Sequence, residues 1–162
     1  MPRRRKEGVS FVRPISPDPR YGSELIEKFI NVIMWRGKKN AARTIMYDAI
    51  DLLIKKSNGD KEKALAMLDR AFEQVIPLVE VRARRVGGSV YQIPTEVNRN
   101  RARALGMRWL IAAAKVRSNK TMGGRLGEEI LEASQGRGGA VKKRTDVHKM
   151  AESNRAFSHY SW

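Results

Sequence analysis

The chain has 162 residues, of which 41% are hydrophobic, and it carries 33 lysines and arginines against 17 aspartates and glutamates. The formal net charge of +16 exceeds what solubility requires and indicates a polyanionic partner. The sequence contains no cysteine, which excludes disulfides and thiolate metal sites, and no apolar run of the roughly 18 to 20 residues that span a membrane. A cytoplasmic protein of one domain, without a secretory signal, is therefore expected.

The first 20 residues predict an extended basic arm, because they contain four prolines and no sustained hydrophobic period. Four consecutive cations favour contact with nucleic acid over a simple solubility tail: Arg3, Arg4, Arg5 and Lys6. Residues 21–162 are expected to form the folded domain.

Three segments with helical spacing follow the arm. The first begins after Ser23, a good N-cap residue, and runs to about Trp35. The second covers residues 38–56. The third begins after the N-cap Asp60 and ends at Pro77, because proline cannot donate the next backbone hydrogen bond.

Residues 78–94, LVEVRARRVGGSVYQIP, alternate in character around a Gly-Gly pair and predict a β-hairpin. With Gly87 and Gly88 as the central turn residues, the expected pairs are Val86 with Ser89, Arg84 with Tyr91, and Arg82 with Ile93. One face is then basic with an aromatic ring. The other face requires apolar cover for Val79, Val81, Ala83 and Val90. The tip, with Arg85 beside it, is expected to project beyond the core while the base of the hairpin packs on the helices.

Three further helices are predicted after the hairpin: residues 98–116, a helix beginning at Thr121, and a C-terminal helix from about 140 to 156. Three glycines weaken the second of these by about 1 kcal/mol each relative to alanine: Gly123, Gly124 and Gly127. Trp35 and Trp109 lie on apolar helical stripes and are expected in the core. The predicted fold class is mainly α, a single bundle of about six helices with a protruding hairpin between the third and fourth.

The positive charge is concentrated in one quarter of the chain. Residues 82–120 hold ten basic side chains, eight of them arginine, and the single acid Glu96. Guanidinium groups form forked hydrogen bonds to phosphates and stack on bases, so this segment favours RNA as the partner. Tyr91 offers either a ring for an unstacked base or an ordinary cross-strand packing partner for Arg84.

The candidate RNA-binding residues extend beyond that segment. Cations in the loop after the first helix lie where backbone N–H groups of the next helix add to an anion site, and a basic run begins the last helix. Besides the arm, the set is Arg36, Lys38, Lys39, Arg82, Arg84, Arg85, Tyr91, Arg99, Arg101, Arg103, Arg108, Lys115, Arg117, Lys142, Lys143 and Arg144.

The remaining motifs do not indicate a catalytic, nucleotide-binding or metal site. The stretch GRGGAVKKR, residues 136–144, departs from the Walker pattern, because Val141 rather than glycine precedes Lys142 and another lysine follows it. The two histidines, His148 and His159, lie eleven positions apart with no cysteine to complete a zinc site. Paired carboxylates, HExxH and GxSxG motifs are missing. No catalysis, metal or cofactor is therefore expected.

Three stretches together support a family resemblance: VEVRARRVGGSVYQIP, then RALGMRWLIAAAKVR, and finally AVKKRTDVHKMAESNRAFSHYSW. They occur in order and closely resemble bacterial small-subunit ribosomal protein seven, with similarity running from PDPRYGS at 17–23 to the final tryptophan. The segment GVSFVRPIS, residues 8–16, departs from the usual basic lead-in of that family.

The resemblance implies a helical domain with a protruding hairpin that binds the head region of small-subunit ribosomal RNA as a primary binder and nucleates head assembly. It further implies that residues 82–91 reach the exit site, near transfer RNA and messenger RNA. The arm, residues 36–39 and the fourth-helix arginines would then hold ribosomal RNA. The implied partners also include neighbouring small-subunit proteins, in the cytoplasmic ribosome and away from membranes.

Two other classes remain to be separated from this one. A DNA-compacting architectural protein is compatible with the net charge and the basic ribbon, and competition between structured RNA and duplex DNA distinguishes it. An RNA-processing enzyme would require an acid-base or metal cluster, which the sequence does not contain.

Overall fold

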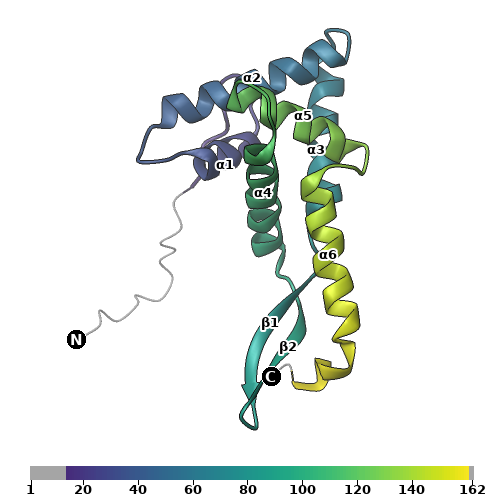
Figure 1. Ribbon diagram of the computed structural model, residues 1–162. Coiled ribbons are helices and arrows are strands. Elements are labelled where there is room, and N and C mark those ends of the chain that lie inside the picture. The colour runs from purple at the N-terminus through teal and green to yellow at the C-terminus, as the bar shows by residue number, and fades with distance from the viewer. Residues whose placement is uncertain (1–13, 161–162) are drawn as a thin grey trace, which may run out of the picture.

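A computed structural model describes residues 14–160, which form six α-helices and one two-stranded antiparallel sheet. A helical body lies at one end, and the hairpin extends from it with the last helix running alongside (Figure 1). In chain order the elements are α1 (Glu24–Ile33), α2 (Lys39–Lys56), α3 (Lys61–Val75), β1 (Val79–Val86), β2 (Ser89–Glu96), α4 (Arg99–Val116), α5 (Met122–Ser134), α6 (Gly139–Ser153) and the short 3-10 helix η1 (Arg155–Tyr160). The mainly α class with a hairpin between the third and fourth helices is confirmed.

Short polar side chains begin the helices where the sequence indicated. The Ser23 hydroxyl accepts a hydrogen bond from the Ile26 N–H, and the Asp60 carboxylate accepts one from the Lys63 N–H. Thr121 caps α5 in the same way. Each cap satisfies a backbone donor that the helix itself leaves unpaired.

The core forms where α2, α3 and α4 pack around α5. Phe29 and Phe72 meet edge to face inside it, with ring centroids 5.3 Å apart. Two of the α5 glycines allow α2 to approach closely: a Cβ at Gly123 would lie 2.5 Å from the Asp48 Cβ, and one at Gly127 would lie 3.0 Å from the Ala49 carbonyl oxygen. These glycines, which the sequence presents as weak points of a helix, are therefore required by packing.

Trp35 departs from the sequence expectation. Helix α1 ends at Ile33, and a turn through Arg36 (φ 51°) and Gly37 (φ 72°) leads into α2. Trp35 therefore lies beyond the helical stripe and is 72% exposed, so its assignment to the core was wrong. Trp109 is partly buried and packs against the core as expected.

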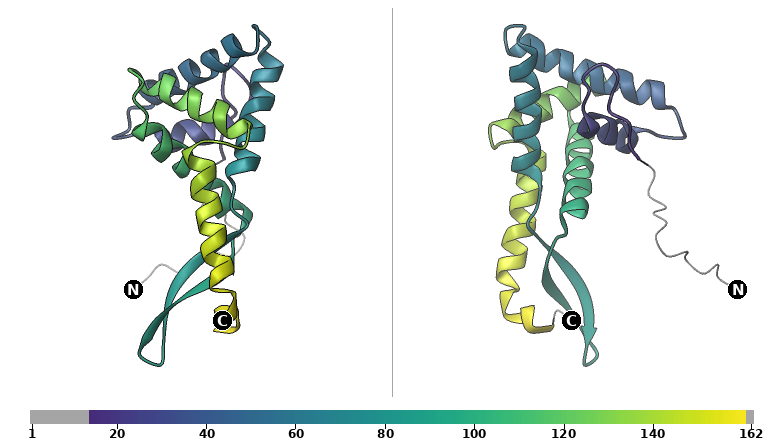
Figure 2. Two further views of the ribbon diagram at one scale, coloured as in Figure 1. Left: turned by 45° about the vertical axis from the view of Figure 1, so that its right-hand side comes forward. Right: turned by 180° about the vertical axis from the view of Figure 1, so that it is seen from behind.

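The hairpin has the predicted register and turn. Val86 pairs with Ser89, Arg84 with Tyr91, and Arg82 with Ile93. Gly87 and Gly88 both have positive φ, 57° and 88°, as a mirror-type turn requires. Views from two further directions show β1 and β2 extending away from the helical body with α6 and η1 beside them (Figure 2).

The prediction of which hairpin face is covered was wrong. The C-terminal elements α6 and η1 pack on the face that contains Tyr91 and Ile93: Ile93 is fully buried, and the Tyr91 ring lies 5.0 Å from Phe157. On the opposite face Ala83 is exposed and Val90 is 68% exposed. Alternation identifies two faces but does not show where a distant helix will lie, so the sequence alone could not make this choice.

Candidate nucleic-acid interface

One buried carboxylate joins the hairpin to α4. Glu80 on β1 accepts hydrogen bonds from Arg82 at 2.7 Å and from Arg101 at 2.8 Å. Burial raises the pKa of Glu80, but the hydrogen bonds from Arg101 and Arg82 outweigh it and hold the pKa below its ordinary value. Because one carboxylate serves two guanidinium groups, a net positive charge remains, and both arginine side chains are about half exposed.

From this junction a row of cations continues along α4. Arg101, Arg108 and Lys115 are spaced seven residues apart, which places them on one side of the helix. All three are exposed, and neither Arg108 nor Lys115 makes an ion pair within residues 14–160. The row is about 21 Å long from the rise per residue of an α-helix. We call Arg101, Arg108 and Lys115 the α4 row.

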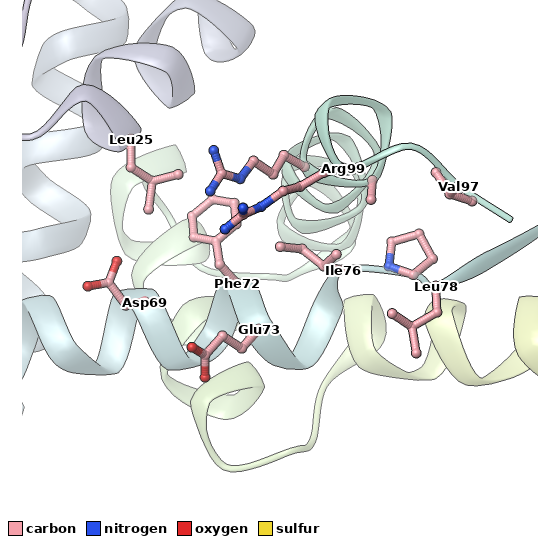
Figure 3. A pocket seen from close by; sticks show the side chains of 11 residues that line it. Leu25, Asp69, Phe72, Glu73, Ile76, Leu78, Val97 and Arg99 are labelled. Atoms are coloured by element: carbon pink, nitrogen blue, oxygen red, sulfur yellow. The ribbon is translucent and has the colours of Figure 1, made fainter.

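Arg99 and Arg103 lie on a different side of α4. They line a cleft of about 500 Å³ between α3, α4 and the base of the hairpin, whose apolar wall includes Phe72 (Figure 3). Asp69 and Glu73 line the same cleft. Burial, and to a smaller extent the charge of Glu73, raise the pKa of Asp69.

The arginines of the fourth helix therefore do not form one surface, and Arg99 and Arg103 share their cleft with two carboxylates. The residues that line the cleft include no histidine, serine, threonine or cysteine. In the described part of the chain, no group of three or more histidine, cysteine, aspartate or glutamate side chains could hold a metal ion.

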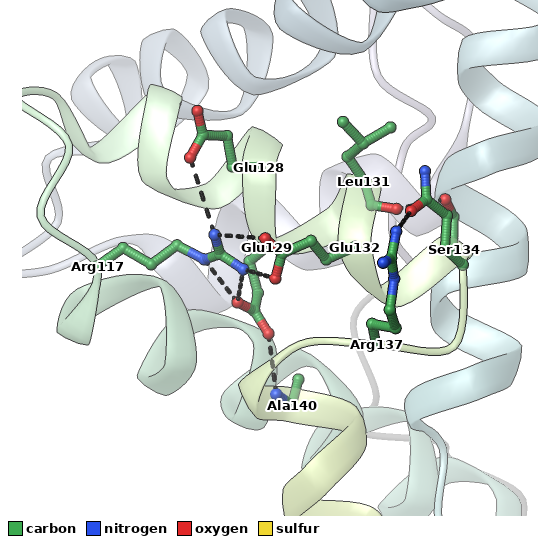
Figure 4. Close-up of polar contacts among 9 residues, drawn as sticks. Arg117, Glu128, Glu129, Leu131, Glu132, Ser134, Arg137 and Ala140 are labelled. Atoms are coloured by element: carbon green, nitrogen blue, oxygen red, sulfur yellow. Dashed lines mark hydrogen bonds and ion pairs between the residues drawn. The ribbon is translucent and has the colours of Figure 1, made fainter.

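Arg117 is held inside the fold. Its side chain is 19% exposed and hydrogen-bonds Glu129 at 2.7 Å and also Glu132, with Glu128 at 3.8 Å (Figure 4). The hydrogen bond to Glu132 raises the pKa of Arg117, and the same bond lowers the pKa of Glu132.

This cluster connects three helices. Glu129 is almost completely buried, and its second oxygen accepts the Ala140 N–H at 2.9 Å. The cluster therefore ties the end of α4 to α5 and to the start of α6. The charge of Arg117 is neutralised there, so we leave it out of the proposed RNA surface.

The loop between α1 and α2 presents two exposed cations, Arg36 and Lys38. Lys39 instead forms an ion pair with the buried Glu27, and Arg43 lies 3.7 Å from the same carboxylate. At the start of α6, Lys142 and Lys143 are exposed, while Arg144 is partly buried and its Nε has no hydrogen-bond partner among the described residues. Arg3, Arg4, Arg5 and Lys6 lie outside the described residues.

The last helix braces the hairpin. Tyr91 contacts Phe157 of η1, which supports its interpretation as a packing residue. At the base of the hairpin the Leu78 N–H donates to His148 Nε2 at 3.2 Å. Burial, together with the nearby charge of Arg144, lowers the pKa of His148 and favours the neutral ring that can accept this bond. Arg84 and Arg85 are carried on this supported ribbon.

Besides Glu129, two further anchoring acids were not indicated by the sequence. Glu80 could have been noticed as the one acid in a basic strand. Asp18 is buried, accepts the N–H groups of Arg20 and Tyr21 at 3.0 Å and the Tyr47 hydroxyl at 2.7 Å, and so fixes the segment before α1 to α2. Burial and the Asp18 hydrogen bond raise the pKa of Tyr47 to about 12. A single aspartate in a proline-rich segment gives no sequence signal of that contact.

A helical body that carries a braced, arginine-bearing hairpin and a continuous row of solvent-facing cations defines a nucleic-acid-binding protein. None of the helices described is both long enough and apolar enough to cross a membrane. The family model described as ribosomal protein S7p/S5e matches residues 3–155. The chain therefore belongs to this family.

Individual relatives align with this sequence over nearly its whole length. The small ribosomal subunit protein uS7 of Idiomarina loihiensis is 53% identical across the full length of both chains. The proteins of the same name from Nitrobacter winogradskyi and Afipia carboxidovorans are 55% and 54% identical over 93% of this chain and 94% of theirs. The resemblance noted in the sequence is confirmed, and the family is one of RNA-binding ribosomal structural proteins rather than enzymes.

Proposed function

We propose that the chain, which is a structural protein of the small subunit of the cytoplasmic ribosome, is a primary binder of small-subunit ribosomal RNA and nucleates assembly of the subunit head. Its partners are then that RNA and neighbouring small-subunit proteins. The division into an arm, residues 1–20, and an RNA-binding domain, residues 21–162, belongs to the same proposal, with the arm as a further RNA contact.

The hairpin has a separate role in this proposal. Residues 82–91 extend from the body toward the exit site at the subunit interface, near transfer RNA and messenger RNA, and the C-terminal helix shares that neighbourhood. The support for this role is the way the hairpin is held, because a two-stranded ribbon alone is only marginally stable in water. The Tyr91 ring packs on Phe157 of η1, and the Leu78 N–H donates to His148 of α6. A braced ribbon can present Arg85 at a fixed place.

The observation that carries the RNA-binding proposal is the α4 row with the Glu80 junction beneath it. Three exposed cations on one side of a helix lead from the hairpin toward the loop after α1, and the acids at Glu80 and Glu129 lie buried rather than on this surface. Such a surface neutralises phosphates along a folded RNA and releases bound counterions. The exposed Arg36 and Lys38 extend it, and Lys142 and Lys143 provide further cations on α6.

A binding competition tests the proposal. The full chain is titrated with a transcript of the head region of small-subunit ribosomal RNA, with duplex DNA of equal length as competitor, at physiological salt. We expect the transcript to bind much more tightly than the duplex, and protein from gently lysed cells to sediment with small subunits. Equal affinity for both nucleic acids, or sedimentation apart from the subunit, would contradict the proposal and favour a DNA-compacting protein.

A further inference from the structure

Trp35 is the aromatic member of the exposed large hydrophobic side chains in the described part of the chain. Exposing an indole to water forgoes the stabilisation that burial of its large apolar surface would give. The fold does not need this residue for its core, because α1 ends before it. Tryptophan is enriched at interfaces, because its ring is apolar while its N–H can still find a hydrogen-bond partner.

The ring is positioned by its surroundings. The Lys38 N–H donates to the Trp35 carbonyl oxygen at 3.0 Å, which closes the turn that follows the ring. From α4, Lys115 Nζ lies over the ring, 5.9 Å from its centroid, within the range of a cation–π interaction. With Lys115 over the ring and most of the residue accessible, the indole still presents a large open surface to a ligand.

The charge around Trp35 selects the kind of ligand. Arg36, Lys38 and Lys115 are exposed. Of the two acids on α1, Glu27 is buried and paired with Lys39, and the exposed Glu24 lies in the first turn, at the other end of the helix from Trp35. The start of α2 adds partial positive charge, because Lys38 supplies no side-chain cap and the first turn holds no acid. An apolar protein partner would have to bury these cations without compensation, whereas a nucleotide supplies both a flat ring and a phosphate.

Trp35 also lies at the end of the α4 row, because Lys115 is the last member of that row and the residue that contacts the indole. We propose that Trp35 is a stacking platform for one unpaired base of the RNA whose phosphates follow Arg101, Arg108 and Lys115. The inference rests on the proposed RNA-binding function and adds to it an uncharged residue that contacts a base rather than a phosphate. The platform accepts any base, since every base has a π-face.

The test uses the full chain and the head-region transcript, with Trp35→Ala, Trp35→Leu and Trp35→Phe as variants and the exposed neighbour change Val116→Ala as the matched control. We expect Trp35→Ala and Trp35→Leu to weaken binding by about 5-fold to 150-fold, the equivalent of roughly 1–3 kcal/mol for one stacked base. Trp35→Phe should retain most of the affinity, and Val116→Ala should match the wild type.

A second readout separates stacking from charge. Loss of an uncharged ring should leave the slope of log affinity against log salt unchanged in all three Trp35 variants, whereas Arg108→Gln should reduce it. If Trp35→Ala or Trp35→Leu binds as tightly as the wild type, the platform is refuted while RNA binding stands. If the Trp35→Ala protein binds the transcript normally but fails to join subunits, a protein occupies the site and the platform is again refuted. A wild-type chain with no affinity for the transcript would overturn the proposed function itself.

Discussion

Arg117 and the α4 row are close in the sequence, yet the fold encloses Arg117 among acids and leaves the α4 row exposed to solvent. Arg117, two residues beyond Lys115, is enclosed by carboxylates of α5 and connects three helices. Arg108 and Lys115 face solvent and make no ion pair in the described residues. The difference shows that a count of cations does not define a nucleic-acid surface, because the acids that folding brings to each cation decide whether its charge remains available.

The largest expected effect is on the enclosed side of this comparison. Arg117→Met should lower the free energy of unfolding by about 3–5 kcal/mol, because it leaves the buried Glu129 carboxylate without its cation. The matched change Arg108→Met, within α4, should alter stability by less than about 0.5 kcal/mol and reduce affinity for ribosomal RNA instead. Urea unfolding measures the stability of the two variants, and titration with the ribosomal RNA transcript measures their affinity. Equal stability of the two variants would remove the distinction.

The cluster around Arg117 also depends on how closely α5 packs against α2. Gly123→Ala should destabilise the protein by about 1–3 kcal/mol, because the new Cβ would overlap Asp48. The cost of this overlap should exceed the stabilisation of about 1 kcal/mol that alanine gives a helix relative to glycine. Gly124→Ala is the control, because its Cβ would meet the Thr121 hydroxyl at 3.2 Å rather than another helix. Thermal unfolding should show a clear loss for the first variant and a change within about 1 kcal/mol for the second. A stabilised Gly123→Ala protein would show that the helices can separate at no cost.

Glu80 lies between the two cases, since it is buried but its two arginines are half exposed. Glu80→Gln should lower stability by about 1–2 kcal/mol through weaker hydrogen bonds and should leave RNA affinity equal or higher, because two guanidinium groups are released. Filter binding and unfolding of the same samples test both parts. Weaker RNA binding by a well-folded Glu80→Gln protein would show that Arg82 and Arg101 must be held by the acid in order to bind.

The smallest effect concerns pH. The pKa of His148 is lowered in the folded state, so the unfolded chain takes up the proton more readily, and stability should fall as pH drops below the ordinary value of 6.5. Protonation also removes the acceptor for the Leu78 N–H, a bond worth roughly 0.5–1.5 kcal/mol. The protection factor of the Leu78 amide at pH 7.5 and 5.0, which corrects its exchange rate for the intrinsic effect of pH, measures this loss. His148→Gln, which keeps an acceptor without titrating, should show a smaller pH dependence.

Local features of this fold were predictable from the sequence, and contacts between distant segments were not. Ser23, Asp60 and the Gly87-Gly88 turn act within a few residues, so the element boundaries and the hairpin register followed from them. The exposed position of Trp35, the covered face at Ile93 and the enclosure of Arg117 depend on where another element lies. Hydrophobic spacing and charge counts do not specify that. The sequence names candidate cations, but the structure is needed to show which of them are paired with acids, as Arg117 and Lys39 are.

The most direct test of the central claim is the salt dependence of binding to the head-region transcript for the wild type and for the double variant Arg108→Gln/Lys115→Gln. If the α4 row contacts two phosphates through these residues, the slope of log affinity against log salt should decrease in magnitude by roughly 1.4 to 1.8. An unchanged slope in a folded double variant would show that the α4 row does not face the RNA.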